Sequence, residues 1–527
     1  MSHVFNACID LDSRMNRISS IAAVIISSFV MSVIFFSISA YNDFPASNQN
    51  PYALRASVLS GLTPALSEDW LFKTTDPYPL ATWITVLFLK HGPDGVYFLY
   101  FMVIGAFMLS FMIFLDSGNR RGDAVSSYLW SGLTVLSALV VGRLTGLSAG
   151  VADQLILGGY WEPSEAAVFL VISMLLFASG RSVWSALCAA LAVALHPSIA
   201  LGALIVETAA CLRLLVERRW RELLILVGVF TVLVLPPVIY TIVRFMPTSV
   251  DLADRASRYL ARQKLPFHAI PMHWLTALDI LKAAMIALAA CIYWKQNGRL
   301  SSVLFTSLIL ATVLTGIFAY LDDNRLLLLF PWRVSAVLAP IALILIVSTV
   351  LNSLPQRAWI YDHQKLLLIP ILLLAGSVQF MKIYYDYPGF IPSYWIEAIF
   401  GTDAFDAKVQ DRVERRDVIN WAKGQDDPNG LYLVPLDFEQ FRIKSGRPIF
   451  VDAKSHPWKD TEVIEYKRRI ELAEKAFESL RECQKIEGNE FDVVILDNSS
   501  FLYKAKPDCK LYDEKQINFR FGFVKLK

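Results

Sequence analysis

The sequence predicts a mainly α-helical protein that crosses a membrane about eleven times and carries an extramembrane α/β domain at its C-terminal end. Composition is the first observation: 55% of the 527 residues are hydrophobic and only 18% are charged, whereas soluble proteins carry about 25% charged residues. The second observation is the distribution of apolar runs. Runs near the length of about 20 residues that a spanning helix needs recur up to residue 381, and residues 382–527 contain none.

The first apolar run follows a short polar start and is too long for the apolar part of a signal peptide, so we expect an uncleaved first span. The expected spans are residues 21–40, 95–115, 124–142, 164–179, 183–196, 198–214, 222–243, 275–294, 300–320, 333–352 and 366–381. His196-Pro197 interrupts one long apolar stretch. Because both flanks of that stretch are basic, we expect two short helices that meet there. A single kinked helix is the alternative.

Short loops rich in Lys and Arg alternate with long loops at residues 41–94, 143–163, 244–273 and 321–332. By the positive-inside rule, the basic loops and the N-terminus are cytoplasmic and the long loops are external. An odd number of spans then places residues 382–527 outside. This domain has strand-like runs at 431–434, 449–451 and 493–496, with a charged helical segment between the last two.

The charge balance and the cysteine spacing argue against nucleic acid as a partner and against a cysteine metal site. The 49 Lys and Arg against 47 Asp and Glu leave a net charge of +2, which gives no basic excess for nucleic acid. The six cysteines have no metal-type spacing. The chain also lacks a Walker A sequence, a dinucleotide-binding glycine motif, H-E-x-x-H and G-x-S-x-G.

The first external loop is the richest candidate for chemistry, because loops of this length usually have a role. Asp43 lies just beyond the first span, where partial desolvation makes a carboxylate more basic and suits it to accept a proton. Asp69, in an adjacent acidic pair, is the second candidate. Asn48 and Gln49 are candidate substrate contacts. For each of these side chains, the alternative is a solvated loop position.

Ionisable groups at membrane depth are functional candidates by default. His196 is the only histidine within the expected spans, at an external helix tip. Arg333 begins a span and either binds a lipid phosphate through its guanidinium or extends to the interface. The adjacent Asp322 and Asp323 are the one candidate pair for a divalent cation, with interface anchoring as the alternative. Asp279 and Lys282, three residues apart, predict an internal ion pair.

Three further positions complete the candidates. Tyr160 lies where an aromatic belt meets the membrane surface and is also a candidate substrate contact. Lys454 and His456 follow a short strand of the C-terminal domain, and binding residues often lie at the carboxyl end of a strand. An ordinary polar turn is the alternative for this pair.

The layout resembles the GT-C superfamily of membrane glycosyltransferases. The resemblance is carried by the acidic first loop, the His-Pro helix tip and the external domain, together with the segments NQNPY, SEDW, YWEPS, HPS, PWR and RPIFVDAKSHP. These segments look closer still to an uncharacterised group of bacterial multi-spanning proteins usually placed near that superfamily. Unlike many members, the chain has no Asp-Glu or D-x-D pair close to its first span.

The resemblance implies a sugar transferase of the bacterial inner membrane that acts in envelope glycan or glycolipid synthesis. A polyprenyl-phosphate donor would bind through Arg333 and His196, and Asp43 or Asp69 would take the proton of an external acceptor. Membrane lipids and the lipid-linked donor are the expected partners. One alternative is a transporter or flippase. The chain lacks matching helix breaks in its two halves, which argues against this alternative. The other alternative is an assembly partner for envelope polysaccharide.

Overall fold

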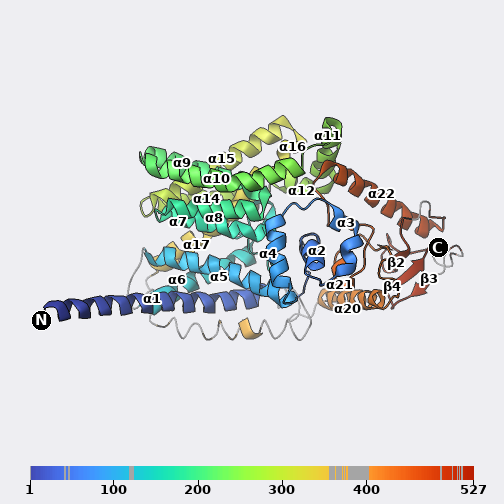
Figure 1. The fold of residues 1–527 in the computed structure, drawn as a ribbon, viewed down its shortest axis with the longest axis horizontal. Coiled ribbons are helices and arrows are strands. Elements are labelled where there is room, and N and C mark those ends of the chain that lie inside the picture. Colours follow the sequence, from blue (N-terminus) through green and yellow to red (C-terminus); the bar gives the residue numbers. More distant parts are fainter. Residues whose placement is uncertain are drawn as a thin grey trace.

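The computed structural model describes residues 2–354 except 41–42, 46–47 and 118–123, isolated positions between 363 and 377, and residues 403–526 except 487–489, 501, 507–508, 510 and 512–513. A bundle of long helices forms one end of the molecule and a smaller domain with a four-stranded sheet forms the other, with the first long loop between them (Figure 1). The predicted class, a helical membrane protein with a C-terminal α/β domain, is confirmed.

The bundle follows the apolar runs of the sequence. Its helices are α1 (Ser2–Ser39), α5 (Pro93–Ser117), α6 (Ala124–Thr145), α7 (Ala167–Ala178), α8 (Ser182–Leu195), α9 (Ala200–Val216), α10 (Trp220–Arg244), α14 (Ala277–Tyr293), α15 (Gly298–Leu321) and α17 (Ser335–Ser353). By length and composition, 7 helices of the described residues can cross a membrane, and α7 and α8 are apolar but shorter. The span expected at 366–381 lies largely outside the described residues.

The chain leaves the helical conformation at His196, as expected. The residue before a proline is disfavoured in a helix, and His196 is extended, with φ −143° and ψ 92°. A short 3-10 turn, η4 (Pro197–Ile199), then leads into α9, which lies against α8. Two helices therefore replace the single kinked helix that was the alternative.

The long loops are largely structured and meet between the bundle and the C-terminal domain (Figure 1). The first loop contains α2 (Gln49–Leu59), η1 (Pro64–Glu68), α3 (Trp70–Lys73) and the apolar α4 (Pro79–Leu89). The other loops contain η2 (Val151–Asp153), η3 (Pro163–Ala166), α11 (Val250–Tyr259), the π-turn η5 (Leu260–Lys264), α12 (Pro266–Ala269), α13 (Pro271–Trp274), α16 (Asn324–Leu327) and η6 (Pro331–Val334).

The C-terminal domain packs helices on both faces of its sheet. It comprises α20 (Asp403–Lys423), β1 (Tyr432–Leu433), α21 (Phe441–Ser445), α22 (Asp460–Glu482), β2 (Val493–Asp497), β3 (Glu514–Gln516) and β4 (Phe521–Lys525), with the strand order β1-β2-β4-β3. β1 pairs parallel with β2, and the other pairs are antiparallel. Alternate residues of β2 enter the core formed with α22 or the core formed with α20 and α21. The run 449–451 contributes only an isolated bridge at Ile449.

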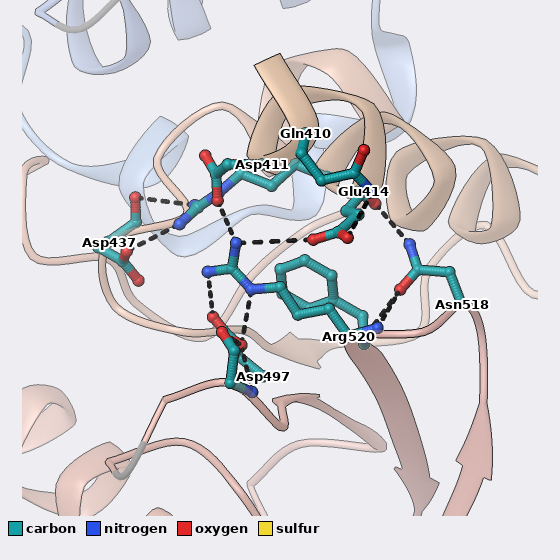
Figure 2. A network of polar contacts seen from close by, with 10 residues as sticks. Gln410, Asp411, Glu414, Asp437, Asp497, Asn518 and Arg520 are labelled. Atoms are coloured by element: carbon teal, nitrogen blue, oxygen red, sulfur yellow. Dashed lines mark hydrogen bonds and ion pairs between the residues drawn. The ribbon is translucent and has the colours of Figure 1, made fainter. Parts of the chain in front are cut away.

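Arg520, directly before β4, ties α20 to this sheet (Figure 2). Its guanidinium donates to both oxygens of Asp497 at the end of β2, at 2.8 and 2.6 Å, and to Asp411 of α20. Arg415 links Asp411 to Asp437 in turn, at 3.1 and 2.9 Å. Helix, strand end and loop are therefore held by shared carboxylates.

A fully buried arginine joins the first loop to this domain. Arg442 of α21 donates to Asp69 at 2.9 Å and to Asp452 at 2.7 Å, and all three side chains are at most 2% exposed. Two further contacts hold the same face, from Thr75 to Glu462 and from Thr248 to Asp460. The first and third long loops and the C-terminal domain therefore lie on one side of the bundle.

The Arg442→Met substitution is expected to destabilise the protein by about 3–5 kcal/mol, because it leaves two carboxylates buried without their cation. Thermal unfolding in detergent micelles measures the loss. The Lys73→Met variant is the matched control, since the Lys73–Glu68 pair is more than half exposed and should contribute about 0–1 kcal/mol. An equally mild effect of both substitutions would contradict the structural role of Arg442.

Candidate functional site

A small cavity lies where the first loop, the segment 161–163 and the segment 456–458 of the C-terminal domain meet, and we call it the junction cavity. Its volume is about 50 Å³, room for roughly three or four water molecules. Tyr52, Tyr78, Trp161, Glu162, His456 and Trp458 are among the residues that line it. Because three distant segments form it, the cavity exists only when the domain is seated on the first loop.

Glu162 lines this cavity, and one oxygen of its carboxylate is buried without a hydrogen-bond partner among the described residues. One side of the carboxylate accepts hydrogen bonds from Ser164 and Asn48, whereas the other oxygen, Oε2, is buried without a partner. Burial raises the pKa of Glu162 above its ordinary value, and the charges of Lys454 and Arg333 oppose this shift. An acceptor oxygen left free in a cavity can take a proton from a bound hydroxyl. The sequence analysis missed Glu162.

Tyr52 and Tyr78 line the junction cavity together with Glu162, and His196 packs on Tyr78 without lining the cavity. The hydroxyls of Tyr52 and Tyr78 are hydrogen-bonded, and burial raises the pKa of Tyr52 and raises that of Tyr78 to about 12. The ring of His196 packs on Tyr78 with centroids 4.6 Å apart. His196 is only 4% exposed, and its Nδ1 lies 2.7 Å from the Ser198 hydroxyl.

Arg333 is a cation with no anionic partner. It lies in η6, and its guanidinium stacks on Phe330, 4.1 Å from the ring centre. One nitrogen donates to Ser198 at 3.1 Å, Nε is buried without a partner, and no carboxylate of the described residues pairs with it. Its charge acts on Tyr52, Tyr78 and Glu162. A desolvated guanidinium left uncompensated is a binding site for an anion such as phosphate.

The position of η6 is set by the loop that leads to Glu162. Val151 N donates to Ser335 at 2.8 Å, directly after η6. Gly150 allows this approach, because a side chain there would collide with the backbone of Ala336. The buried Lys282 then binds the Gly150 carbonyl at 3.0 Å and Asp279 at 3.4 Å. The predicted Asp279–Lys282 ion pair is confirmed, and it holds this loop.

The C-terminal domain contributes Lys454 and His456 through a turn built on Asp452. This carboxylate accepts from the backbone nitrogens of Lys454 and Ser455, at 2.9 and 2.6 Å. His456 Nδ1 lies 3.2 Å from the Lys454 carbonyl oxygen. Because a carbonyl can only accept, Nδ1 carries the proton of the neutral ring and Nε2 is the acceptor nitrogen. Among the described residues, Nε2 is buried without a hydrogen-bond partner. Burial, assisted by the charge of Lys264, lowers the pKa of His456 to about 4.

The remaining predicted substrate contacts divide in two. Gln49 lines the junction cavity and donates to the Trp161 carbonyl at 2.9 Å. Asn48 reaches the cavity through its hydrogen bond to Glu162. Tyr160 is partly buried and does not line the cavity. His456 also lines the cavity. Arg333, His196 and Lys454 do not line it, but each acts on or packs against a residue that does. The roles of all these residues stay predictions.

The two predicted bases lie outside the junction cavity. Asp69 is saturated by Arg442, Ile449 N at 3.1 Å and Leu71 N at 2.8 Å. Asp43 pairs with Lys444 at 2.5 Å and with Arg412 at 3.5 Å, and it lines a separate cleft of about 1040 Å³. Catalysis by either residue stays a prediction, but this geometry favours Glu162 as the proton acceptor.

The adjacent aspartates predicted to hold a cation are both engaged by protein donors. Asp322 pairs with Arg262 at 2.6 Å, and Asp323 caps α16 through the backbone nitrogens of Arg325 and Leu326. Within the described residues, no group of three or more His, Cys, Asp or Glu side chains is arranged to hold a metal ion. A divalent cation at these aspartates stays a prediction that no feature of this geometry supports.

Comparisons with known proteins identify similarity of two kinds. A family model described as a domain of unknown function (DUF6798) matches residues 414–473, the segment that contains Arg442, Lys454 and His456. No curated protein sequence matches the chain.

Among solved structures, the chain is similar to ArnT from Cupriavidus metallidurans bound to undecaprenyl phosphate and in the apo state. The TM-score is 0.48 and the identity 13% in both cases, over 96% and 97% of this chain and 97% and 98% of those chains. ArnT is a GT-C glycosyltransferase, the superfamily that the sequence resembles. At this identity and score, the likeness assigns no activity.

The protein is expected to lose stability as the pH falls from about 6.5 towards 4, and His456→Gln should reduce that loss. The folded state lowers the pKa of His456 from 6.5 to about 4, so between these values the unfolded state binds more protons and acid favours unfolding. Unfolding midpoints measured across this range test the prediction. His273→Gln, at an exposed histidine, should leave the pH dependence unchanged; equal behaviour of both variants would contradict it.

Proposed function

We propose that this protein is a membrane glycosyltransferase of the GT-C kind, which moves a sugar from a polyprenyl-phosphate donor to an acceptor outside the cytoplasm. One observation carries the proposal: among the described residues, buried Arg333 has no ion-pair partner and its charge acts on Glu162, whose Oε2 has no hydrogen-bond partner. A site that leaves both a cation and a carboxylate oxygen unsatisfied is complementary to a phosphate leaving group next to a hydroxyl that must lose its proton.

The chemistry follows from these residues. Arg333 and Lys454, whose charges both act on Glu162, bind the donor phosphate. The acceptor oxygen bonds to the anomeric carbon of the sugar while the bond from that carbon to the phosphate oxygen breaks. The hydroxyl proton passes to Glu162, and the electron pair of the broken bond stays on the phosphate, where Arg333 stabilises it.

The residues around Arg333 and Glu162 orient the reactants. Ser198, held by His196, fixes the guanidinium of Arg333. His456 is neutral near pH 7 and offers Nε2 as an acceptor to a sugar hydroxyl. Apolar side chains that include Phe267 and Met272 are exposed on the short helices packed beside Trp332. Such a surface next to Arg333 suits a donor that arrives from the lipid phase.

Glu162→Gln is expected to lower sugar transfer by about 10²–10⁴-fold, the usual contribution of a general base. The assay incubates protein in lipid nanodiscs with a lipid extract of the producing bacterium and measures released polyprenyl phosphate by mass spectrometry. Burial raises the pKa of Glu162 above the ordinary carboxyl value of 4.5. The wild-type rate should therefore fall as the pH is lowered, with the midpoint of this fall above pH 4.5.

Asp43→Asn is the matched control, since Asp43 lies in the separate cleft, and it should retain most of the activity. An active Glu162→Gln variant together with an inactive Asp43→Asn variant would assign the proton acceptor to the first loop instead. Loss of activity in both variants would count against Glu162 as the sole base, and unfolding midpoints would show whether folding was the cause.

The C-terminal domain is placed outside the cytoplasm in this proposal. Cys483 and Cys509 form a disulfide with their Cα atoms 5.6 Å apart, and disulfides persist in oxidising compartments. A reporter active only in the periplasm and fused after Lys527 is expected to be active, whereas the same reporter after Arg219 should be silent. The reverse pattern would place the C-terminal domain in the cytoplasm and would contradict transfer to an acceptor outside it.

A further inference from the structure

Another buried carboxyl with an unsatisfied oxygen lies inside the bundle, away from the junction cavity. Glu207 of α9 is 4% exposed. One oxygen accepts from Ser173 at 3.3 Å, and Ser173 lies 3.0 Å from Ser185, whereas Oε2 is buried without a partner. Among the described residues, no lysine, arginine or histidine forms an ion pair with it. A lone carboxyl at this depth is costly and marks a candidate functional site.

Glu207 lines an apolar groove of about 410 Å³ between α9 and α10. The other lining residues include Leu204, Cys211, Leu226, Phe230, Val234 and Leu235. Only 11% of the spanning part of α10 is buried, and Leu204 and Leu235 are 54% and 51% exposed. The groove therefore opens to the lipid phase, and its volume falls in the ordinary range of small-molecule sites.

The hydrogen-bonding groups of the Glu207 carboxyl indicate which kind of molecule the groove can bind. Without a cation nearby, a carboxyl in an apolar setting is neutral, so it presents one O–H donor and one acceptor oxygen. A hydrocarbon chain satisfies neither, and a phosphate finds no cation. An alcohol satisfies both, because its hydroxyl donates one hydrogen bond and accepts another.

We propose that the groove between α9 and α10 binds a lipid alcohol, with its hydroxyl on Glu207 and its chain along the two helices. The site is independent of the proposed transfer reaction. Glu207 follows Ser198 by nine residues, roughly 13 Å along the helix axis, so the alcohol does not occupy the Arg333 site.

Dicyclohexylcarbodiimide, an apolar reagent for protonated carboxyls, tests the site in protein reconstituted into lipid nanodiscs. The Glu207 oxygen adds to the central carbon of the reagent and the carboxyl proton moves to a reagent nitrogen, which gives an O-acylisourea. The acyl group then shifts from that oxygen to a reagent nitrogen and leaves a stable N-acylurea, which mass spectrometry maps. Phytol, a branched C20 alcohol, is expected to reduce labelling of Glu207 at least fivefold, and phytane, the hydrocarbon of the same skeleton, should not protect it.

Phytol retained by the purified protein provides a second measurement. Glu207→Leu is expected to lose retention at least tenfold, whereas Glu207→Gln keeps a donor and an acceptor and should retain most of it. Glu165 is buried but lies outside the groove. It is the control for the carbodiimide experiment, because phytol should not change its labelling. Equal protection by phytol and phytane, or equal retention by the Leu and Gln variants, would overturn the proposal.

Discussion

The buried Arg442 between Asp69 and Asp452 is the interaction on which the rest of the structure depends. It ties α3 of the first loop to α21 and to the turn that carries Lys454 and His456. Breaking a buried charge pair leaves an uncompensated charge at a cost of several kcal/mol, so the domain and the loop hold each other in one arrangement. The junction cavity is a consequence of that arrangement, because its walls come from both partners.

Some buried charges of the described residues are satisfied by ion pairs and others are not, and this contrast supports the proposed site. Lys282, Arg442 and Arg520 are each satisfied by carboxylates that they share with neighbouring elements. Arg333 and Glu162 each keep a buried polar atom without a partner. Since buried polar groups are normally hydrogen-bonded, the unsatisfied atoms indicate where a ligand completes the structure.

Much of the fold was predictable from the sequence, because membrane spans follow directly from apolar runs and basic loops. The break at His196 was predictable from its proline. The helix α4 was missed because its length of 11 residues is too short for a membrane span. Arg333 was predicted as a site residue because ionisable groups are functional candidates at membrane depth, and Lys454 and His456 were predicted because they follow a strand-like run. These roles stay predictions.

The proposed proton acceptor could not be predicted in the same way. Asp69 looked available because its partner Arg442 lies 373 residues away, a pairing that no local pattern reveals. Glu162 looked like a turn residue next to Pro163, since the bonds from Asn48 and Ser164 that leave one oxygen free arise only in the folded chain. Sequence therefore indicates which residues are unusual, and tertiary pairing decides which of them are free.

The central claim is that Arg333 binds the phosphate of a lipid-linked donor. The most direct measurement is the affinity of undecaprenyl phosphate for the wild type and for Arg333→Gln in detergent micelles, with Arg325→Gln as the control because Arg325 is exposed and paired with Asp254. A lost charge-assisted hydrogen bond of about 1.5–3 kcal/mol corresponds to about 10–150-fold weaker binding. We expect that loss for Arg333→Gln and no loss for Arg325→Gln. Equal affinity of all three proteins would contradict the assignment of Arg333.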